Sequence, residues 1–314
     1  MCCLFGILDY NHSLSKRQMN RLLSILSTAC EARGTDATGI AYNYSGKLRI
    51  YKRPLPAHIM RYNVPDGVSV VMGHTRMATQ GSEKLNFNNH PFYGKANGSF
   101  ALAHNGVIYN DEQIRKNKNL PLTHIETDSY IAVQLIECKN ELNFDSLKYM
   151  AEQLQGSMTI TVLDSSDNLY IVKGDNPLCL YHYPERGLYI YASTEEILTA
   201  GLKKLHQNLG NHEKIRIASG EILRIDSSGG QTRSQFDDME LYYAYSFYPY
   251  SHGWGDIWSA PSKPSTSTLD PAEKQYLDDM KHIAYHFGYM PEDIDELLVE
   301  GYTLDEIEEF IFAT

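Results

Sequence analysis

The chain has 314 residues, of which 42% are hydrophobic and 21% charged, a composition typical of a folded protein and not of a disordered one. Its net charge of −11 is concentrated in residues 270–314, which carry 13 Asp and Glu against Lys274 and Lys281, so we expect no basic surface for nucleic acid. The sequence has neither an apolar run of about 18 residues nor the pattern of a signal peptide, so we expect no membrane association and a cytoplasmic location.

The first 226 residues combine many predicted strands with few predicted helices. Apolar residues at helical spacing predict helices at 15–32 and 127–141. Short β-rich runs bounded by turn residues predict strands at 4–8, 39–44, 47–52, 68–74, 100–103, 157–163, 169–172, 187–192 and 221–225. Because strands dominate and do not alternate regularly with helices, we expect a layered α+β domain rather than a parallel doubly wound sheet.

The composition changes after residue 226. Aromatic residues crowd positions 242–258, where they either wrap over the main domain or form a partner-binding strip. Residues 261–268 contain only Ser, Thr, Pro and one Lys, which is typical of a linker. We therefore expect an aromatic-rich extension and linker at 227–269.

The acidic segment 270–314 is predicted to form three short amphipathic helices. Asp270 before Pro271 marks a helix start, Gly288 can end that helix, and Thr303 with Glu306 makes a capping box. Apolar residues recur at helical spacing within each stretch, so the segment is predicted to be a small helical bundle with an acidic exterior. It serves either as a stabilising cap or as a docking module, and both interpretations stay open.

Cys2 is the candidate nucleophile. Removal of Met1 would leave a cysteine whose own α-amine, with an ordinary pKa of about 7.7–8.0, can accept the thiol proton. By itself, Met-Cys-Cys also fits an exposed start or a lipidation site. The five cysteines show neither a disulfide pattern nor metal-ligand spacing, so we expect free thiols and no metal.

Three later segments supply groups that amide chemistry needs. Arg76 follows a predicted strand, where its guanidinium can hold a carboxylate. Asn105 and Gly106 follow another strand and place a side-chain amide beside a backbone N–H, two donors for an oxyanion. Asp128 opens a predicted helix, where it can face an ammonium. Each residue also has an ordinary interpretation, as a surface ion pair, a hairpin turn or a helix-start charge, but the combination behind Cys2 favours catalysis.

These residues make the chain resemble the class II glutamine amidotransferases, which are N-terminal nucleophile hydrolases, over roughly residues 2–226. The similar stretches are residues 33–39 (Arg-Gly-Thr-Asp-Ala-Thr-Gly), 74–76 (His-Thr-Arg) with 78–79 (Ala-Thr), 89–91 (Asn-His-Pro), 104–106 (His-Asn-Gly) and 127–129 (Thr-Asp-Ser). The glucosamine-6-phosphate synthase type is the most similar. The resemblance implies an α+β fold, a four-layer αββα sandwich, followed here by the small three-helix module.

The resemblance also implies a role for each matched residue. Cys2 corresponds to the nucleophile, with its own amine as the base, and Asn105 and Gly106 correspond to the oxyanion hole. Arg76 corresponds to the residue that binds the α-carboxylate of glutamine, and Asp128 to the one that binds its α-ammonium.

Three further residues match with supporting roles. Arg33 resembles an arginine that supports the active-site terminus, and Thr79 and His90 match positions that line the pocket. No cofactor is implied.

Two positions depart from the family pattern. Cys3 stands where glycine is usual, and Met77 where tryptophan is frequent. Only Cys2 can carry a free α-amine, so we expect Cys3 to be a buried strand residue. Met77 leaves open how the loop closes and how ammonia leaves.

The leading functional hypothesis is a glutaminase that forms a γ-glutamyl thioester on Cys2 and supplies ammonia to a separate synthase. Residues beyond 226 resemble no sugar-isomerase, phosphoribosyltransferase or synthetase domain, so the acceptor enzyme is expected to be another chain. One alternative is a γ-glutamyl amide hydrolase that acts on a larger conjugate. The other is a non-catalytic interaction protein that retains the fold.

Overall fold

The computed structural model of the chain describes residues 2–205 and 208–241, together with single helical residues between 274 and 307. The chain divides into two compact units, residues 1–250 and 251–314. The predicted aromatic cluster at 242–258 and the predicted linker at 261–268 lie outside the described residues. In the described part of the chain, no helix has the length and apolar character needed to cross a membrane.

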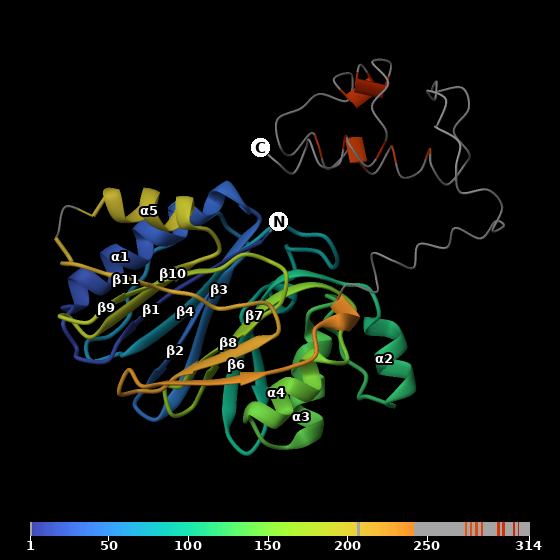
Figure 1. Cartoon of the computed structure of the whole chain (residues 1–314), viewed down its shortest axis with the longest axis horizontal. Helices are drawn as coiled ribbons and strands as arrows, with labels where there is room; N and C mark the ends of the chain where they lie inside the picture. Colours follow the sequence, from blue (N-terminus) through green and yellow to red (C-terminus); the bar gives the residue numbers. More distant parts are fainter. Residues whose placement is uncertain are drawn as a thin grey trace. The chain divides into compact units, whose positions relative to one another are not determined.

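Two antiparallel sheets form the centre of the first unit (Figure 1). The seven-stranded sheet has the order β11-β9-β10-β1-β4-β2-β3, and the six-stranded sheet has the order β13-β12-β8-β7-β6-β5. The strands of the first sheet are β1 (Cys3–Asp9), β2 (Ala37–Tyr44), β3 (Lys47–Arg53), β4 (Val70–Arg76), β9 (Cys179–Tyr183), β10 (Leu188–Ala192) and β11 (Glu213–Ile215). Those of the second are β5 (Phe92–Lys95), β6 (Ser99–Ile108), β7 (Gly156–Asp164), β8 (Leu169–Lys173), β12 (Glu221–Ile225) and β13 (Gln231–Gln235).

Helices cover the outer face of each sheet (Figure 1). Helices α1 (Lys16–Ala29) and α5 (Glu195–Lys203) pack together on the seven-stranded sheet, and α1 continues into the 3-10 turn η1 (Cys30–Ala32). The six-stranded sheet is covered by α2 (Asp111–Asn117), α3 (Tyr130–Lys139) and α4 (Phe144–Ala151). Two further 3-10 turns are η2 (Ala57–Ile59) and η3 (Asn86–Asn88).

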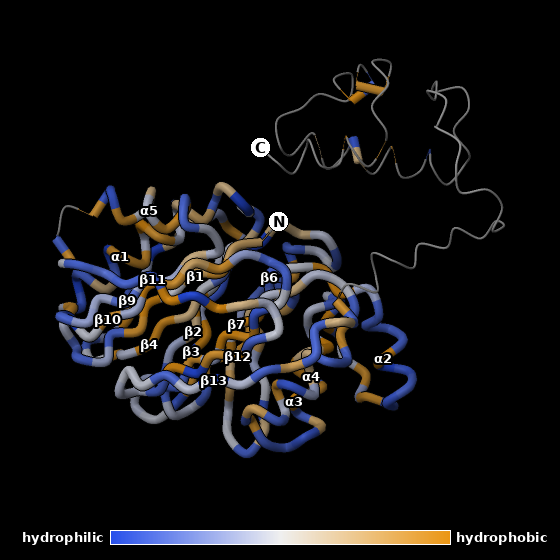
Figure 2. Tube along the Cα trace, viewed as in Figure 1, coloured by the Kyte–Doolittle hydropathy of each residue, from blue (hydrophilic) through white to orange (hydrophobic). Residues whose placement is uncertain are grey.

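Three apolar layers hold this sandwich together. Successive side chains of a strand point to opposite faces, so each sheet contributes to a layer between the sheets and to a layer under its helices. In β1, for example, Leu4 and Leu8 pack between the sheets, whereas Phe5 and Ile7 pack beneath α1. Figure 2 shows the apolar residues that run along the central strands. The predicted four-layer αββα architecture is therefore confirmed.

The predicted elements agree with the structure in type more closely than in extent. The helices expected at 15–32 and 127–141 are α1 with η1, and α3. The strand expected at 100–103 continues to Ile108, and the short helices α2, α4 and α5 were not predicted. Strand β13 belongs to the six-stranded sheet, so the first unit continues beyond the boundary expected at residue 226.

The described residues of the second unit are helical. Its buried cluster contains apolar positions that the helical spacing predicted, namely Leu277, Met280, Ala284, Ile294, Leu298 and Ile307. Lys281 forms an ion pair with Asp295 at 2.6 Å. This unit therefore has an apolar centre of its own, as a helical bundle requires.

Candidate active site

Cys2 lies immediately before β1 and faces the interior of the sandwich. Because side chains alternate along the strand, Cys2 lies on the same face as Leu4, which packs between the sheets. Its thiol donates to the carbonyl of Met77 at 3.5 Å, and Arg33 Nε donates to the carbonyl of Cys2 at 3.0 Å. Cys3 faces the opposite way and is fully buried beneath α1, as predicted. Arg33 therefore fixes the main chain at the half-buried Cys2.

The electrostatic surroundings of the Cys2 thiol connect it to two other predicted site residues. Burial raises the pKa of the thiol, because an apolar environment disfavours the thiolate. The positive charge of Arg76 lowers this pKa and the negative charge of Asp128 raises it, both less strongly than burial. The thiol, the guanidinium and the carboxylate thus lie within electrostatic reach of one another.

Arg76 is the last residue of β4 and is buried. Its guanidinium donates to Asn89 Oδ1 at 2.8 Å and to the carbonyls of Gln80 and Gly81 at 2.5 and 2.8 Å. These three bonds hold the loop that follows β4. A guanidinium has five N–H groups, and these bonds account for three of them.

Residues 33–36 pack against the start of the same loop and bond to it. A side chain at Gly34 would place its Cβ 2.5 Å from the carbonyl carbon of Arg76, so only glycine allows this approach. Asp36 accepts the N–H of Ala78 at 2.7 Å, and its own N–H donates to the carbonyl of Arg76 at 2.9 Å. Gly34 and Asp36 therefore link the motif at residues 33–39 to the backbone at Arg76 and Ala78.

Asn105 lies within β6 and not after it. Strand β6 pairs with β7 through Ile108, with Asn105 opposite Thr159, which excludes the hairpin-turn interpretation. The Asn105 side chain is fully buried, yet its amide nitrogen and oxygen have no hydrogen-bond partner among the described residues. A buried amide without partners costs about 1–3 kcal/mol, which makes Asn105 a candidate for binding a ligand.

Gly106 follows with a backbone conformation that favours glycine. Its φ is +148°, and an added Cβ would lie 1.9 Å from the carbonyl oxygen of Ser157. Gly106→Ala is therefore expected to lower the free energy of unfolding by about 3 kcal/mol or more.

Chemical denaturation measures this loss, and Gly46→Ala is the matched control. Gly46 has φ +70° and open space around it, so alanine there is expected to cost about 1 kcal/mol. Equal losses at the two positions would contradict the steric account of Gly106.

Asp128 is buried and connects the start of α3 to β6. Its Oδ2 accepts the N–H of Ile108 at 2.7 Å, and its Oδ1 accepts the N–H and hydroxyl of Ser129 at 2.8 and 3.2 Å. The Ser129 hydroxyl also lies 2.8 Å from His104 Nδ1. The carboxylate is thus fixed in place beside the strand that carries Asn105.

The two residues predicted to line the pocket differ in their surroundings. His90 is buried, packs against the tilted ring of His74 at a centroid distance of 4.2 Å, and has no hydrogen-bond partner for either ring nitrogen among the described residues. Thr79 is exposed on the loop after β4. His90 therefore belongs to the interior near Arg76, whereas Thr79 lies at its rim.

Three buried histidines predict acid lability. Burial lowers the pKa of His74 to about 3 and also lowers those of His90 and His104. Below about pH 6.5 the unfolded chain binds protons that the folded chain does not, so stability is lost as the pH falls. Between pH 7.5 and 5.5 we therefore expect the free energy of unfolding to fall, and His74, whose pKa of about 3 lies well below this range, contributes about 1.4 kcal/mol of the decrease.

The variant His90→Phe tests this expectation. It removes one of the three imidazoles, so denaturant titrations at the two pH values should show a smaller decrease than in the wild type. An unchanged decrease would show that other groups cause the acid lability.

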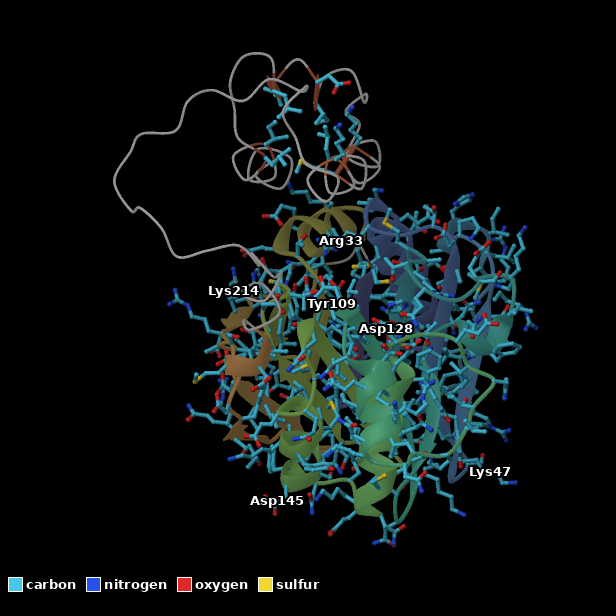
Figure 3. All side chains as sticks on the ribbon, turned by 90° about the vertical axis from the view of Figure 1, so that its right-hand side faces the viewer. Arg33, Lys47, Tyr109, Asp128, Asp145 and Lys214 are labelled. Carbon is cyan, nitrogen blue, oxygen red and sulfur yellow. The ribbon has the colours of Figure 1, made fainter. Side chains whose placement is uncertain are left out.

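The fold brings the predicted residues to one end of the sandwich. Cys2 and Arg76 come from the seven-stranded sheet, whereas Asn105 comes from the six-stranded sheet and Asp128 from the start of α3. The two sheets are joined here by a hydrogen bond of 2.9 Å from His74 Nε2 to the carbonyl of His104. Figure 3 shows Arg33 and Asp128 toward the same end of the domain. In the described part of the chain, no cluster of His, Cys, Asp and Glu is suited to a metal ion.

One residue of this end was not predicted. Asn176 donates from its side-chain amide to the carbonyl of Asn105 at 3.1 Å. Its sequence context, Asp-Asn-Pro after β8, predicts only a turn. The contact joins positions 71 residues apart, so no local pattern could have predicted it.

Comparison with known proteins assigns this architecture to a class. Residues 74–200 match the model of the glutamine amidotransferase domain. The N-terminal nucleophile hydrolase fold is shared with glutamine phosphoribosylpyrophosphate amidotransferase from B. subtilis, at a TM-score of 0.59, 21% identity and coverage of 75% of this chain and 49% of that one. A structure described as the allosteric regulatory enzyme of purine biosynthesis gives a TM-score of 0.60 at 19% identity, with the same coverage. The chain is therefore similar to glutamine amidotransferases in the sequence of residues 74–200 and in fold, and the predicted resemblance to class II is confirmed.

The sequence relatives are enzymes of the predicted type. Glutamine–fructose-6-phosphate aminotransferase (isomerizing) from Staphylococcus aureus is 29% identical over 242 residues, which cover 73% of this chain and 38% of the relative. The enzyme of the same name from Bacillus thuringiensis subsp. konkukian is 34% identical over 157 residues, or 47% of this chain and 26% of the relative. The chain thus spans less than two fifths of the length of these relatives.

Proposed function

We propose that this protein hydrolyses the side-chain amide of glutamine through a γ-glutamyl thioester on Cys2 and supplies the ammonia to a separate acceptor enzyme. The observation that carries the proposal is the buried Asn105 amide, which has no hydrogen-bond partner among the residues that the structure describes and lies at the same end of the sandwich as Cys2 and Arg76. A buried donor with no protein partner is what an oxyanion hole requires before its substrate binds.

The proposed first step is attack by the Cys2 sulfur on the amide carbon of glutamine. With Met1 removed, the α-amine of Cys2 accepts the thiol proton, which matters because burial raises the pKa of that thiol. The carbonyl oxygen becomes an oxyanion that accepts from the Asn105 amide and the Gly106 N–H. The proton then passes to the amide nitrogen, the C–N bond breaks, and ammonia leaves.

The second step returns the enzyme to its starting state. Water adds to the thioester carbon and gives one proton to the α-amine, and the C–S bond breaks to release glutamate and the Cys2 thiol. In both steps Arg76 holds the α-carboxylate with its remaining N–H groups and Asp128 holds the α-ammonium. His90 and Thr79 line the pocket, and Arg33 keeps the Cys2 main chain in position.

The direct test is product analysis of purified protein incubated with glutamine. We expect ammonia and glutamate in equal amounts from protein that lacks Met1. Release of ammonia from a γ-glutamyl conjugate but not from glutamine would contradict glutamine as the substrate. An absence of release from both, with Met1 gone and candidate acceptor enzymes present, would contradict the proposed activity itself.

The same assay, run with a candidate acceptor enzyme, tests whether ammonia is transferred directly. An acceptor that receives ammonia directly should convert glutamine nitrogen into its product while little free ammonia appears. Addition of unlabelled ammonium to a reaction with ¹⁵N-amide glutamine should then leave the product labelled. Full dilution of the label would contradict direct transfer.

A further inference from the structure

The side chain of Asn176 is hydrogen-bonded to the backbone of the proposed oxyanion hole. It is 9% exposed, and its amide nitrogen donates to the carbonyl oxygen of Asn105 at 3.1 Å. This contact reaches the main chain of Asn105, whereas the side-chain amide of Asn105 has no partner in the described part of the chain. Asn176 thus acts on the strand and not on the substrate pocket directly.

The carbonyl of Asn105 and the N–H of Gly106 belong to one peptide unit. That unit is planar and trans, so its carbonyl and N–H point in opposite directions. A bond that fixes the carbonyl therefore also fixes the direction of the N–H. A donor at the carbonyl further polarises the unit, which strengthens the N–H as a donor.

The N–H of Gly106 points to a side of β6 that β5 does not cover. The carbonyl of His104 bonds to His74 and the N–H of Ile108 bonds to Asp128, both outside β7. Because the backbone groups of successive residues in a strand point to alternate sides, the N–H of Gly106 points to this same side, and the carbonyl of Asn105 points toward β7. On the other side, β5 pairs with β6 only as far as Leu102. The part of β6 after Leu102 therefore has no neighbouring strand on this side, so the Gly106 N–H can donate to a substrate oxygen there.

Asn176 is itself held on two sides. Its carbonyl accepts the hydroxyl of Thr159 at 2.6 Å, and the preceding residue, Asp175, accepts the N–H of Met158 at 2.7 Å. Because Thr159 is opposite Asn105 in the sheet, Asn105, Thr159 and Asn176 form a closed ring of contacts. Such a ring restricts rotation of the peptide that precedes Gly106, where a glycine would otherwise be free to turn.

From this geometry we propose that Asn176 is a positioning residue, which orients the N–H of Gly106 toward the developing oxyanion of glutamine hydrolysis. The inference rests on the proposed function. Asn176 stabilises the transition state through the peptide that it holds, and Thr159 keeps Asn176 in register with β7.

The variant Asn176→Ala separates this role from a merely structural one. Loss of one oxyanion donor costs about 10²–10³ in kcat, so misorientation of one of two donors is expected to lower kcat about 10- to 100-fold, with KM within about threefold. Affinity for glutamate γ-semialdehyde, which forms a tetrahedral adduct with a thiol, should fall by the same factor. Alkylation of Cys2 by iodoacetamide needs no oxyanion hole and should keep its rate within about twofold.

Asn20→Ala is the matched control. The Asn20 amide also bridges two carbonyls, those of Lys16 and Val64 at 2.8 and 2.9 Å, but on α1 and away from the proposed site. Its kcat should equal that of the wild type. If Asn176→Ala does not fold, Thr159→Val removes the hydroxyl that holds Asn176 and should lower kcat in the same direction, again with an unchanged alkylation rate.

The outcomes distinguish this inference from the proposed function. Wild-type protein that does not hydrolyse glutamine contradicts the proposed function. Active wild-type protein whose Asn176→Ala and Thr159→Val variants keep full kcat overturns the role of Asn176. An alkylation rate that falls as far as kcat also overturns it, because the effect would then arise from disturbance of Cys2.

Discussion

Replacement of Cys2 with alanine is expected to lower kcat for glutamine hydrolysis by about 10⁴-fold or more, since the variant cannot form the thioester. Cys2 precedes β1 and is only half-buried, so the thermal unfolding midpoint should change little. Ammonia release and the unfolding midpoint, measured on the same preparation, check both expectations. Substantial hydrolysis by the Cys2→Ala protein would exclude Cys2 as the nucleophile.

Cys3→Ala is the matched control for this variant. It makes the same chemical change one residue further along, where the side chain is fully buried beneath α1. We expect kcat within about threefold of the wild type and a loss of stability of about 1–2 kcal/mol, because a cavity is left in the core. Cys2→Ala should thus lose activity but little stability, whereas Cys3→Ala should lose stability but little activity. A Cys3→Ala protein that remains folded but does not hydrolyse glutamine would contradict Cys2 as the nucleophile.

Asn105→Leu is expected to abolish most of the activity without a loss of stability. Leucine has a similar shape but no donor, so kcat should fall about 10²- to 10³-fold while KM changes little. The Asn105 amide has no partner among the described residues, so its removal should leave the free energy of unfolding unchanged or raise it by about 1 kcal/mol. Steady-state kinetics and chemical denaturation measure the two effects.

Asn88→Leu is the corresponding control. Asn88 is also fully buried, but its amide donates to the carbonyl of Ser82 and to Glu126 Oε2, and its oxygen accepts the N–H of Glu126. Its replacement should lower the free energy of unfolding by about 2–3 kcal/mol. If Asn105→Leu instead lost as much stability as Asn88→Leu and kept its activity, Asn105 would be a structural residue.

The sequence predicted the parts of the fold that depend on local patterns. Helix α1 and strand β1 have clear helical and strand patterns, and both form as expected. Arg76 was predicted at the end of a strand and lies there. The alternation of side chains along β1 also explains why Cys2 and Cys3 differ, because one faces the other sheet and the other faces α1.

The remaining features depend on contacts between distant parts of the chain. His-Asn-Gly after an apolar run is typical of a strand that ends in a turn, but pairing with β7 extends β6 through these residues. The bond from Asn176 to Asn105 and the packing of Gly34 against Arg76 likewise join segments separated by 71 and 42 residues. Tertiary pairing decides such positions, and local propensity does not.

The measurement that tests the central claim most directly is covalent labelling with a glutamine analogue that carries an electrophilic ketone in place of the amide. Intact-mass analysis and peptide mapping of the treated protein should show one adduct, on the sulfur of Cys2, in chains that lack Met1. Excess glutamine should slow the labelling, and Cys3, Cys30, Cys138 and Cys179 should stay unmodified. Labelling at another cysteine, or labelling of Cys2 that glutamine does not slow, would contradict Cys2 as the nucleophile of a glutamine site.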